Sequence, residues 1–584
     1  MVQLPVSFLL LLCITFSVAT PPPQLVRWSS NSYGPDGPWQ AITLTIGTPP
    51  QTVDLLPGGS WMSNVLAPSI CTGNAPCNIA KSAGFYDPSV SSSTFQIAQT
   101  GFVNNISMFD TVGAIPSLQG SANWMFDTVF ISLGNGTAGN EYKQRLLDFD
   151  LLVLSDAHQT LPDGTTYPVQ VGKLALGAPN FNQTWLHFPP QPNWNGTLLP
   201  SSLFGMGGSP SNSYGMHVGS TQLGIPGSLT LGGYDQSRVL GVVSSQSYNI
   251  DHLPIDLLDI GIGVAEGQSP FDFTSKSGLL AEGNSSIGIA LSIYVEAPVS
   301  YLHLPQSTCD AITKYLPVTY KPNLGLYLWD TDDPMYELIV SSPSYLSFTF
   351  RLSNSVSQNM TINVPFSLLN MTLTSPIVSS PVPYLPISPG HAPSDNFALG
   401  RAFMQAAFVG VNWQTGNGVW FLGQAPGPNT PSDTPALTIV PNDNVILGST
   451  TQWRDTWKGV WKVIDTPASP TAEVPTSSKT STRSLLPTED QGLSKGTIIG
   501  IAVGAGLGIL LACVAGFFLL RRRKARRQQS LQVPQQFAPQ DYRAEGYAPH
   551  NSLPSQREKY GSTIYTPREM DAGFTAKRPV EMEG

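Results

Sequence analysis

The sequence has little cysteine and histidine and lacks the short motifs that mark many hydrolytic and nucleotide-binding sites. Of 584 residues, five are cysteine and seven are histidine. The histidines form no H-E-x-x-H pair, and there is no G-x-S-x-G elbow or phosphate-binding loop. The one close cysteine pair has neither the spacing nor the histidine partners of a zinc site. These absences argue against zinc, serine-hydrolase and nucleotide-dependent chemistry, and we expect no metal and no cofactor.

Long amphipathic helical patterns are also scarce, which favours an all-β fold. Short alternating runs such as ITLTIG, GSLTLGG and YLSFTFRL recur, with turn-forming residues between them. The β-rich part extends over about residues 21–462. Because this length is large for one sheet sandwich, we expect two β-rich lobes.

The two ends of the chain predict a membrane protein that enters the secretory route. Residues 1–20 have the apolar run and small residues of a signal peptide. Residues 496–520 contain no charge and are long enough to span a bilayer as a helix. RRRKARR follows at once, so the positive-inside rule places the C-terminus in the cytosol. We predict a single-pass type I protein of the plasma membrane, with the vacuolar membrane left open.

Two segments near the span are predicted to be disordered. Residues 466–495 are dense in Ser, Thr and Pro and are predicted to form a stalk. Residues 521–584 are predicted to form a cytoplasmic tail. After Leu520 the chain has 12 Lys/Arg and 7 Asp/Glu, a net +5, so the total of −9 leaves −14 for the preceding part. An acidic ectodomain argues against nucleic acid as a partner. Small residues recur every four positions in the span and suggest self-association through Gly496, Gly500, Gly504 and Gly508.

Cysteines and sequons agree with an extracellular ectodomain. Cys71 and Cys77 are expected to close a short disulfide loop. Cys309 is left over, either as a buried free thiol, which we favour, or as half of an intermolecular bridge. Seven Asn-x-Ser/Thr sequons precede the span and predict N-glycosylation at Asn105, Asn135, Asn182, Asn195, Asn284, Asn359 and Asn370.

Several stretches in order resemble the pepsin-type aspartic proteases, and most closely their fungal members. They are IGTPPQTVDLL, CTGNAPCNIAKSAGFYDPSVSSST, FDTVFI, SLFGMGG, GSLTLGGYDQSRVLG, YLHLP and LGRAFMQAAFVGVNWQTGNGVWFLGQA. In the family, the segment matched by SLFGMGG lies beneath the first active-site loop. The resemblance implies a bilobal fold with an N-terminal lobe at 38–245, a C-terminal lobe at 246–425 and an extension at 426–465 that packs on the lobes.

The residues that would carry the family's chemistry are changed. Its two aspartates share a water and a proton, and each belongs to an Asp-Thr/Ser-Gly motif. In the first lobe the matching position is Gly58, or Pro57 if the register shifts by one. In the second lobe it is Glu296, followed by Ala297 without a hydroxyl and by a proline instead of glycine. Glu296 is thus the one candidate catalytic residue, and a catalytically inactive homologue is predicted.

Two further positions bear on this interpretation. Asp54 is the nearest acid to the first-lobe site, but strand alternation predicts that it faces solvent. The region before FDTV, where the family has a flap tyrosine, contains none, and Phe109 is its nearest aromatic.

A group of tryptophans follows the protease-like region. WRDTWKGVW would place Trp453, Trp457 and Trp461 on one face of a helix. Packing against the β-rich body is favoured over a ligand platform.

The leading hypothesis is therefore a membrane-anchored surface glycoprotein whose aspartic-peptidase-like ectodomain is non-catalytic and binds a peptide or a cell-wall polymer in its cleft. One alternative is an active aspartic endopeptidase that uses Glu296 with an unrecognised second acid. Another is a structural or sensor-type protein of the cell wall.

Overall fold

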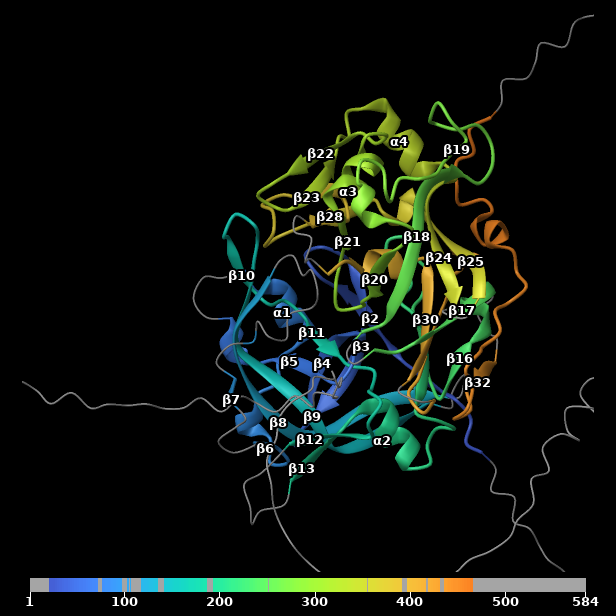
Figure 1. Ribbon diagram of the computed structural model, residues 1–584. Helices are drawn as coiled ribbons and strands as arrows, with labels where there is room; N and C mark the ends of the chain where they lie inside the picture. Colours follow the sequence, from blue (N-terminus) through green and yellow to red (C-terminus); the bar gives the residue numbers. More distant parts are fainter. Residues whose placement is uncertain are drawn as a thin grey trace, which may run out of the picture. The chain divides into compact units, whose positions relative to one another are not determined.

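The architecture of the chain was analysed in a computed structural model (Figure 1). The structure describes residues 20–465 except 72–75, 97–101, 104–105, 107–116, 135–140, 186–192, 250–251, 354–355, 391–395, 416–417 and 431–434. The described residues all belong to one compact unit, and a second unit begins at Ala472, outside the described ranges. The predicted signal peptide (up to residue 19), stalk, span and tail, and the glycines of the span, also lie outside them.

The described part of the chain is mostly β-sheet, which confirms the all-β prediction. The largest sheet contains 18 described strands and combines the first half of the chain with two strands from near residue 415. Its strands are β1 Gln24–Val26, β2 Trp28–Tyr33, β3 Trp39–Ile46, β4 Gln51–Pro57, β5 Ser63–Leu66, β6 Phe95–Gln96, β7 Phe102–Val103, β8 Ser117–Gly134, β9 Glu141–Thr160, β10 Thr166–Pro168, β11 Gly172–Leu174, β12 Asn182–Trp185, β13 Trp194–Thr197, β14 Ser213–His217, β15 Ser228–Leu231, β17 Leu240–Ser247, β30 Ala407–Asn412 and β31 Val419–Gln424.

The second half of the chain builds smaller sheets. An eight-stranded sheet contains β18 Pro254–Val264, β19 Ser275–Lys276, β20 Leu291–Val295, β21 Leu302–Pro305, β24 Ser344–Ser353, β25 Val356–Pro365, β28 Ile387–Gly390 and β29 Ala398–Leu399. A four-stranded sheet contains β22 Val318–Lys321, β23 Leu326–Trp329, β26 Met371–Leu373 and β27 Val382–Leu385. A pair is formed by β16 Gly233–Asp235 and β32 Ala436–Thr438.

The helices are short and lie at the ends of strands or in connections. Those described as α-helical are α1 Asn78–Ala83, α2 Leu199–Gly205, α3 Gln306–Thr313, α4 Pro334–Ser341 and α5 Arg401–Met404. The sequence of α4 shows why such a helix starts where it does: Asp333 accepts a hydrogen bond from the amide of Met335, and Pro334 occupies the first helical position.

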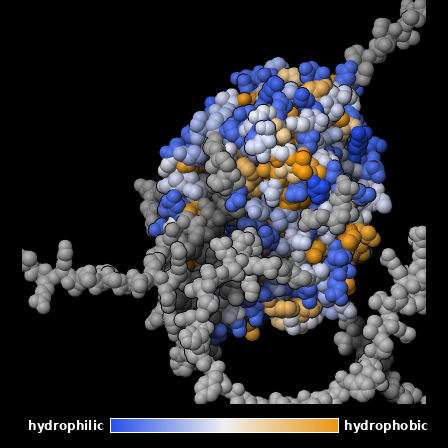
Figure 2. Space-filling model, in the orientation of Figure 1, coloured by the Kyte–Doolittle hydropathy of each residue, from blue (hydrophilic) through white to orange (hydrophobic). Residues whose placement is uncertain are grey.

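Strand patterning explains where the core lies. In β24, SYLSFTFRLS, the residues alternate between buried and half-buried over its first eight positions, so one face packs inward. By contrast β30 is buried at every position, and it pairs with β14 on one side and β31 on the other within the large sheet. On the face shown in Figure 2, hydrophilic residues cover most of the described surface and hydrophobic ones gather in small patches.

The extension after residue 425 packs against both halves of the body. β32 pairs with β16 of the first half, and the amide of Lys462 donates to the carbonyl of Ser341 in the second. Trp457 and Trp461 are buried and stack with their ring centroids 5.1 Å apart, while Trp453 lies edge-on to Tyr345. The tryptophans therefore contribute to packing, as predicted, although the helix is a single 3-10 turn, Trp453–Trp457.

Candidate functional site

The candidate acid Glu296 follows directly after β20 and is buried. Its amide donates to the carbonyl of Leu399 in the neighbouring parallel strand β29, at 3.1 Å. Its side chain is 7% exposed, and Oε1 lies 2.9 Å from Nδ1 of His252. The imidazole in turn packs against the ring of Tyr294, with centroids 4.5 Å apart. Glu296 is thus held by a histidine.

The matching position in the first half of the chain is Gly58. β4 ends at Pro57 and runs parallel to β11, and the amide of Gly58 donates to the carbonyl of Leu174 at 2.9 Å. Gly58 and Glu296 therefore occupy equivalent places. Each is the first residue after a strand, and the amide of each donates to a carbonyl at the end of a neighbouring parallel strand. Of the two registers considered from sequence, this pairing favours Gly58 over Pro57.

The Gly58 loop and the Glu296 loop are packed so closely that no side chain fits between them. Gly58 has a φ of +134°, and a Cβ built there would overlap the Cβ of Ala297. At Gly59 a Cβ would come within 2.9 Å of Cγ of Pro298. Contacts under 3 Å require the backbone or the proline ring to move, so an acid at Gly58 would need a rearranged loop.

A small cavity, here called the Glu296 cavity, lies at this junction. It is lined by residues that include Gly58, Ser60, Tyr248, Glu296, Met404 and Trp413. Its volume of about 20 Å³ is enough for a single water molecule. Among the described residues that line it, Glu296 is the only acid.

Tyrosines give the Glu296 cavity its other polar contacts. The hydroxyl of Tyr248 donates to Oγ of Ser60 at 2.9 Å, which ties the two halves together. Burial raises the pKa of Tyr214, and the charges of Tyr248 and Glu296 raise it further. Tyr214 therefore stays a neutral hydroxyl.

A second cavity, here called the Arg401 cavity, is about four times larger, at 80 Å³. Its lining combines Asp36, Gln170 and Lys173 of the first half with Val299, Ser300 and Arg401 of the second. A ligand in it would therefore contact both halves of the body.

Arg401, at the start of α5, holds the loop that follows Glu296. Its guanidinium donates through Nη1 to the carbonyl of Ala297 at 2.9 Å and through Nη2 to Oγ of Ser300 at 2.6 Å. It also packs over the ring of Trp39, 5.0 Å from its centroid. Burial lowers the pKa of Arg401, and the negative charge of Asp36 opposes this shift most strongly. Arg401 thus connects the Glu296 loop to the first half of the chain.

Two expectations about the first half are corrected. Asp54 is buried instead of facing solvent, because hydroxyls of Ser29, Tyr33 and Thr43 donate to its carboxylate at 2.5–2.7 Å. SLFGMGG lies largely in α2, whereas the strand that runs parallel to β4 is β11, Gly172–Leu174. The apolar segment beneath the first loop is therefore KLALG, about 30 residues earlier in the chain.

Two of the quoted sequence stretches contact each other through Asp127. The carboxylate of Asp127, in FDTVFI, accepts hydrogen bonds from the hydroxyls of Tyr86 at 2.6 Å and Ser91 at 2.7 Å, which belong to FYDPSVSSST. The hydroxyls of one stretch thus satisfy the buried carboxylate of the other.

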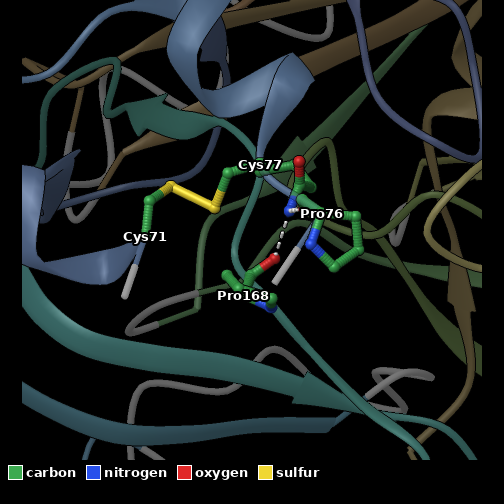
Figure 3. The surroundings of a disulfide bond; sticks show 5 residues. Cys71, Pro76, Cys77 and Pro168 are labelled. Carbon is green, nitrogen blue, oxygen red and sulfur yellow. Dashed lines mark hydrogen bonds between the residues drawn. A yellow bond between two sulfur atoms is a disulfide. The ribbon is translucent and has the colours of Figure 1, made fainter. Parts of the chain in front are cut away.

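The predicted disulfide is present, between Cys71 and Cys77, with Cα atoms 5.9 Å apart (Figure 3). Cys309 is a buried free cysteine, and burial raises the pKa of its thiol well above the usual value. This agrees with the buried-thiol interpretation.

The sequons differ in exposure. Asn105 and Asn135, like Phe109, lie outside the described residues. Asn182, Asn195 and Asn359 are exposed, whereas Asn284 and Asn370 are half-buried. Nδ2 of Asn284 donates to Oγ of Ser307, and Oδ1 of Asn370 accepts from the hydroxyl of Tyr336.

Sequence reasoning missed His252, Asp36, Gln170 and Arg401. Of these only Arg401 had a signal, because it stands in LGRAFM, a stretch already matched to the second lobe. Within the described ranges, no group of three or more His, Cys, Asp or Glu side chains is placed to hold a metal ion. No helix in the described part of the chain is long and apolar enough to cross a membrane.

A comparison with protein-family models finds no family that matches the chain, and a comparison with curated proteins finds no match either.

Proposed function

We propose that the chain is a membrane-anchored glycoprotein of the cell surface whose ectodomain has the bilobal fold of pepsin-type aspartic proteases and binds an extended peptide or a wall polymer without cleaving it. The anchoring part of the proposal rests on the sequence of residues 1–20 and 496–520. The non-catalytic part rests on the geometry at Glu296.

One observation carries the non-catalytic assignment. The family's reaction needs two carboxylates close enough to split their pKa values. The position equivalent to Glu296 is Gly58, where even a Cβ would overlap Ala297. The space that the side chain of a first acid would need is thus occupied by Ala297 of the opposite loop.

Two arrangements support the bilobal part of the proposal. The parallel pair β4–β11 in the first half has a counterpart in β20–β29 of the second half. Strands β30 and β31, from near the end of the β-rich region, complete the sheet of the first half beside β14 and β17. Two similar halves joined by a shared sheet are what the resemblance implies.

The binding part of the proposal is supported by the Arg401 cavity. It lies between the two halves and is lined by both apolar and polar side chains, the usual composition of a ligand pocket. The Glu296 cavity, with room for one water molecule, is too small for a ligand.

The test is a peptide-cleavage assay of the full chain, purified in detergent, across pH 3 to 7. We expect no turnover above that of the Glu296→Gln variant, and no effect of a pepstatin-type inhibitor. Turnover that this inhibitor blocks and Glu296→Gln abolishes would overturn the proposal and favour an active endopeptidase. Binding is tested by fluorescence anisotropy of the full chain with labelled peptides and with wall-polymer oligomers. The absence of binding to all of them by the folded protein would overturn the binding part of the proposal.

A further inference from the structure

A group of apolar side chains is exposed where β9, the start of β12 and α2 meet. Leu147, Phe181 and Met206 are each about half exposed, and Phe204 is half-buried. The ring centroids of Phe181 and Phe204 lie 5.9 Å apart, and Sδ of Met206 lies 3.9 Å from Nε2 of Gln144 in β9. Single exposed apolar residues are common, whereas several in one place indicate a surface that is covered. These four apolar residues are here called the Phe181 patch.

Two hydrogen bonds hold the segments of the Phe181 patch against one another. The hydroxyl of Thr197, in β13, donates to the carbonyl of Leu147 at 2.7 Å. The hydroxyl of Ser201, in α2, donates to the carbonyl of Phe181 at 2.5 Å. β13 also pairs with β9 through Thr197 and Phe149. The β12–β13 hairpin and α2 therefore lie beside β9 (Figure 1).

The predicted glycosylation site Asn182 lies at the edge of this patch. It follows Phe181 in the chain and is exposed. Across the hairpin it pairs with Thr197, and paired residues of antiparallel strands have Cβ atoms about 4.5–5.5 Å apart on the same face. Because the hydroxyl of Thr197 bonds the carbonyl of Leu147, Asn182 is next to the patch both along the chain and across the sheet.

The second sequon of the hairpin, at Asn195, lies farther from Phe181. Asn195 pairs with Thr184, which is two positions further along β12 than Asn182. Residues two apart in a strand point to the same face, so both asparagines project on the face of Thr197. Of the two acceptors, Asn182 is therefore the one placed to bring a glycan onto the patch.

A sugar attached to Asn182 suits this surface better than a protein partner does. A pyranose ring carries C–H groups on its faces, and the electronegative face of an aromatic ring attracts such groups. Covering Phe181 and Leu147 also removes apolar area from water. A protein that approached the patch would first meet the glycan of Asn182. The occupant that the geometry favours is therefore attached to the chain itself.

We propose that the N-glycan of Asn182 covers the Phe181 patch, with its first N-acetylglucosamine on the ring of Phe181. Nδ2 of Asn182 forms a bond to the anomeric carbon of a lipid-linked oligosaccharide, the lipid diphosphate leaves with the bonding electrons, and Nδ2 loses one proton. The inference rests on the proposed glycoprotein nature of the chain. It gives this glycan a structural role, as the cover of an apolar surface.

The test is hydroxyl-radical footprinting of the full glycosylated chain in a lipid nanodisc, read by mass spectrometry of its peptides. Phe95 is the internal reference, because its exposed fraction is 48% against 46% for Phe181. In the wild-type chain we expect Phe181 to be oxidised about threefold more slowly than Phe95, because the sugar excludes solvent from it. In Asn182→Gln the two rates should become similar.

A matched control separates the cover from the general effect of losing a glycan. Asn359 is also an exposed sequon asparagine, but it lies in β25 of the eight-stranded sheet. Asn359→Gln should leave the rate at Phe181 unchanged. Circular dichroism and the melting temperature establish that both variants are folded. Enzymatic removal of the glycans from the folded wild-type chain should raise the rate at Phe181 as Asn182→Gln does, so the comparison does not depend on either variant.

The outcomes separate this inference from the proposed function. Glycosidase digestion converts a glycosylated asparagine to aspartate, so peptide masses report which sequons are occupied. An occupied Asn182 with the same rate at Phe181 before and after glycan removal overturns the cover and leaves the glycoprotein proposal in place. An unoccupied Asn182 beside other occupied sequons has the same consequence. A chain with no occupied sequon overturns both.

Discussion

Nδ1 of His252 lies 2.9 Å from Oε1 of Glu296, a residue 44 positions later in the chain. The side chain of Glu296 is buried, and it interacts with an imidazole whose side chain is 34% exposed. The position opposite is a glycine that cannot accept a side chain. The Glu296 site therefore has the geometry of a structural contact.

The Glu296–His252 contact is expected to contribute to stability. A hydrogen bond to a charged group contributes about 1.5–3 kcal/mol, and the partial exposure of His252 reduces this to about 1–2 kcal/mol. A double-mutant cycle with Glu296→Leu and His252→Ala, measured by denaturant unfolding, should give a coupling of that size. The exposed pair Lys462–Glu337 is the reference and should couple by about 0–0.5 kcal/mol. Additive effects at Glu296 and His252 would contradict the contact.

Gly58 is expected to tolerate no side chain. Gly58→Ala introduces both a disfavoured φ and an overlap with Ala297, so we expect a loss of about 3 kcal/mol in unfolding free energy. Gly164 also has a positive φ, +85°, but has open space around its Cβ position. Gly164→Ala should therefore cost only about 1 kcal/mol.

A compensating change tests the cause. Adding Ala297→Gly to Gly58→Ala removes the overlap but not the φ strain, and should recover the difference between the two single glycine variants. If Ala297→Gly gave no recovery, the two loops would not be in contact.

Asp150 is expected to make the protein less stable as pH rises. Burial raises the pKa of Asp150 to about 8, although the hydrogen bond from Nε1 of Trp185 opposes the shift. Between the unfolded pKa near 3.8 and the folded value, the folded state binds the additional proton. The stabilisation that the protonated Asp150 gives the folded state is therefore complete below about pH 4. It is lost progressively as the pH rises from about 4 to about 8.

Asp150→Asn should remove this decline, since an amide does not titrate and still accepts from Trp185. At pH 7 the variant should be more stable than wild type by up to about 4 kcal/mol, and the difference should vanish near pH 4. Urea unfolding at a series of pH values measures it, with Asp332→Asn as the control for an exposed carboxylate. A pH-independent difference would show that Asp150 does not titrate in this range.

The thiols of the described residues should react in a defined order. Cys71 and Cys77 are bonded and Cys309 is buried, so a thiol reagent should label none of the three in the native chain. Unfolding without reductant should expose Cys309, and reduction should add the other two. Cysteine-containing peptides identified by mass spectrometry distinguish them from Cys13 and Cys513. Labelling of native Cys309 would contradict its burial.

The disulfide should also stabilise the fold. It closes a loop of six residues of separation, for which the loop-entropy relation gives about 2–2.5 kcal/mol. Cys71→Ser with Cys77→Ser should lower the unfolding free energy by that amount, measured by denaturant unfolding without reductant. An unchanged unfolding free energy would contradict a stabilising disulfide.

Much of the β architecture could be predicted from sequence, because strand patterns and turn residues are local signals. YLSFTFRL alternates in β24 as its side chains suggest, and the proximity of Cys71 and Cys77 in sequence suffices for their pairing. It was also readable from the sequence that neither Pro57 nor Gly58 is an acid. Alternation alone misplaced Asp54, because it tells which residues share a strand face but not whether hydroxyls from other strands cover that face.

The contacts that define the site depend on tertiary structure. Glu296 meets His252, Gln170 meets Pro76, and Arg401 meets Trp39 across separations of 44, 94 and more than 300 residues. No local propensity encodes such pairs, since they exist only once sheet topology brings the strand ends together. The amino-acid sequence by itself determined that the chain is β-rich and that neither Pro57 nor Gly58 is an acid. The tertiary structure decided that position 58 has no room for a side chain, because the Cβ of Ala297 fills the space that a Cβ on Gly58 would need.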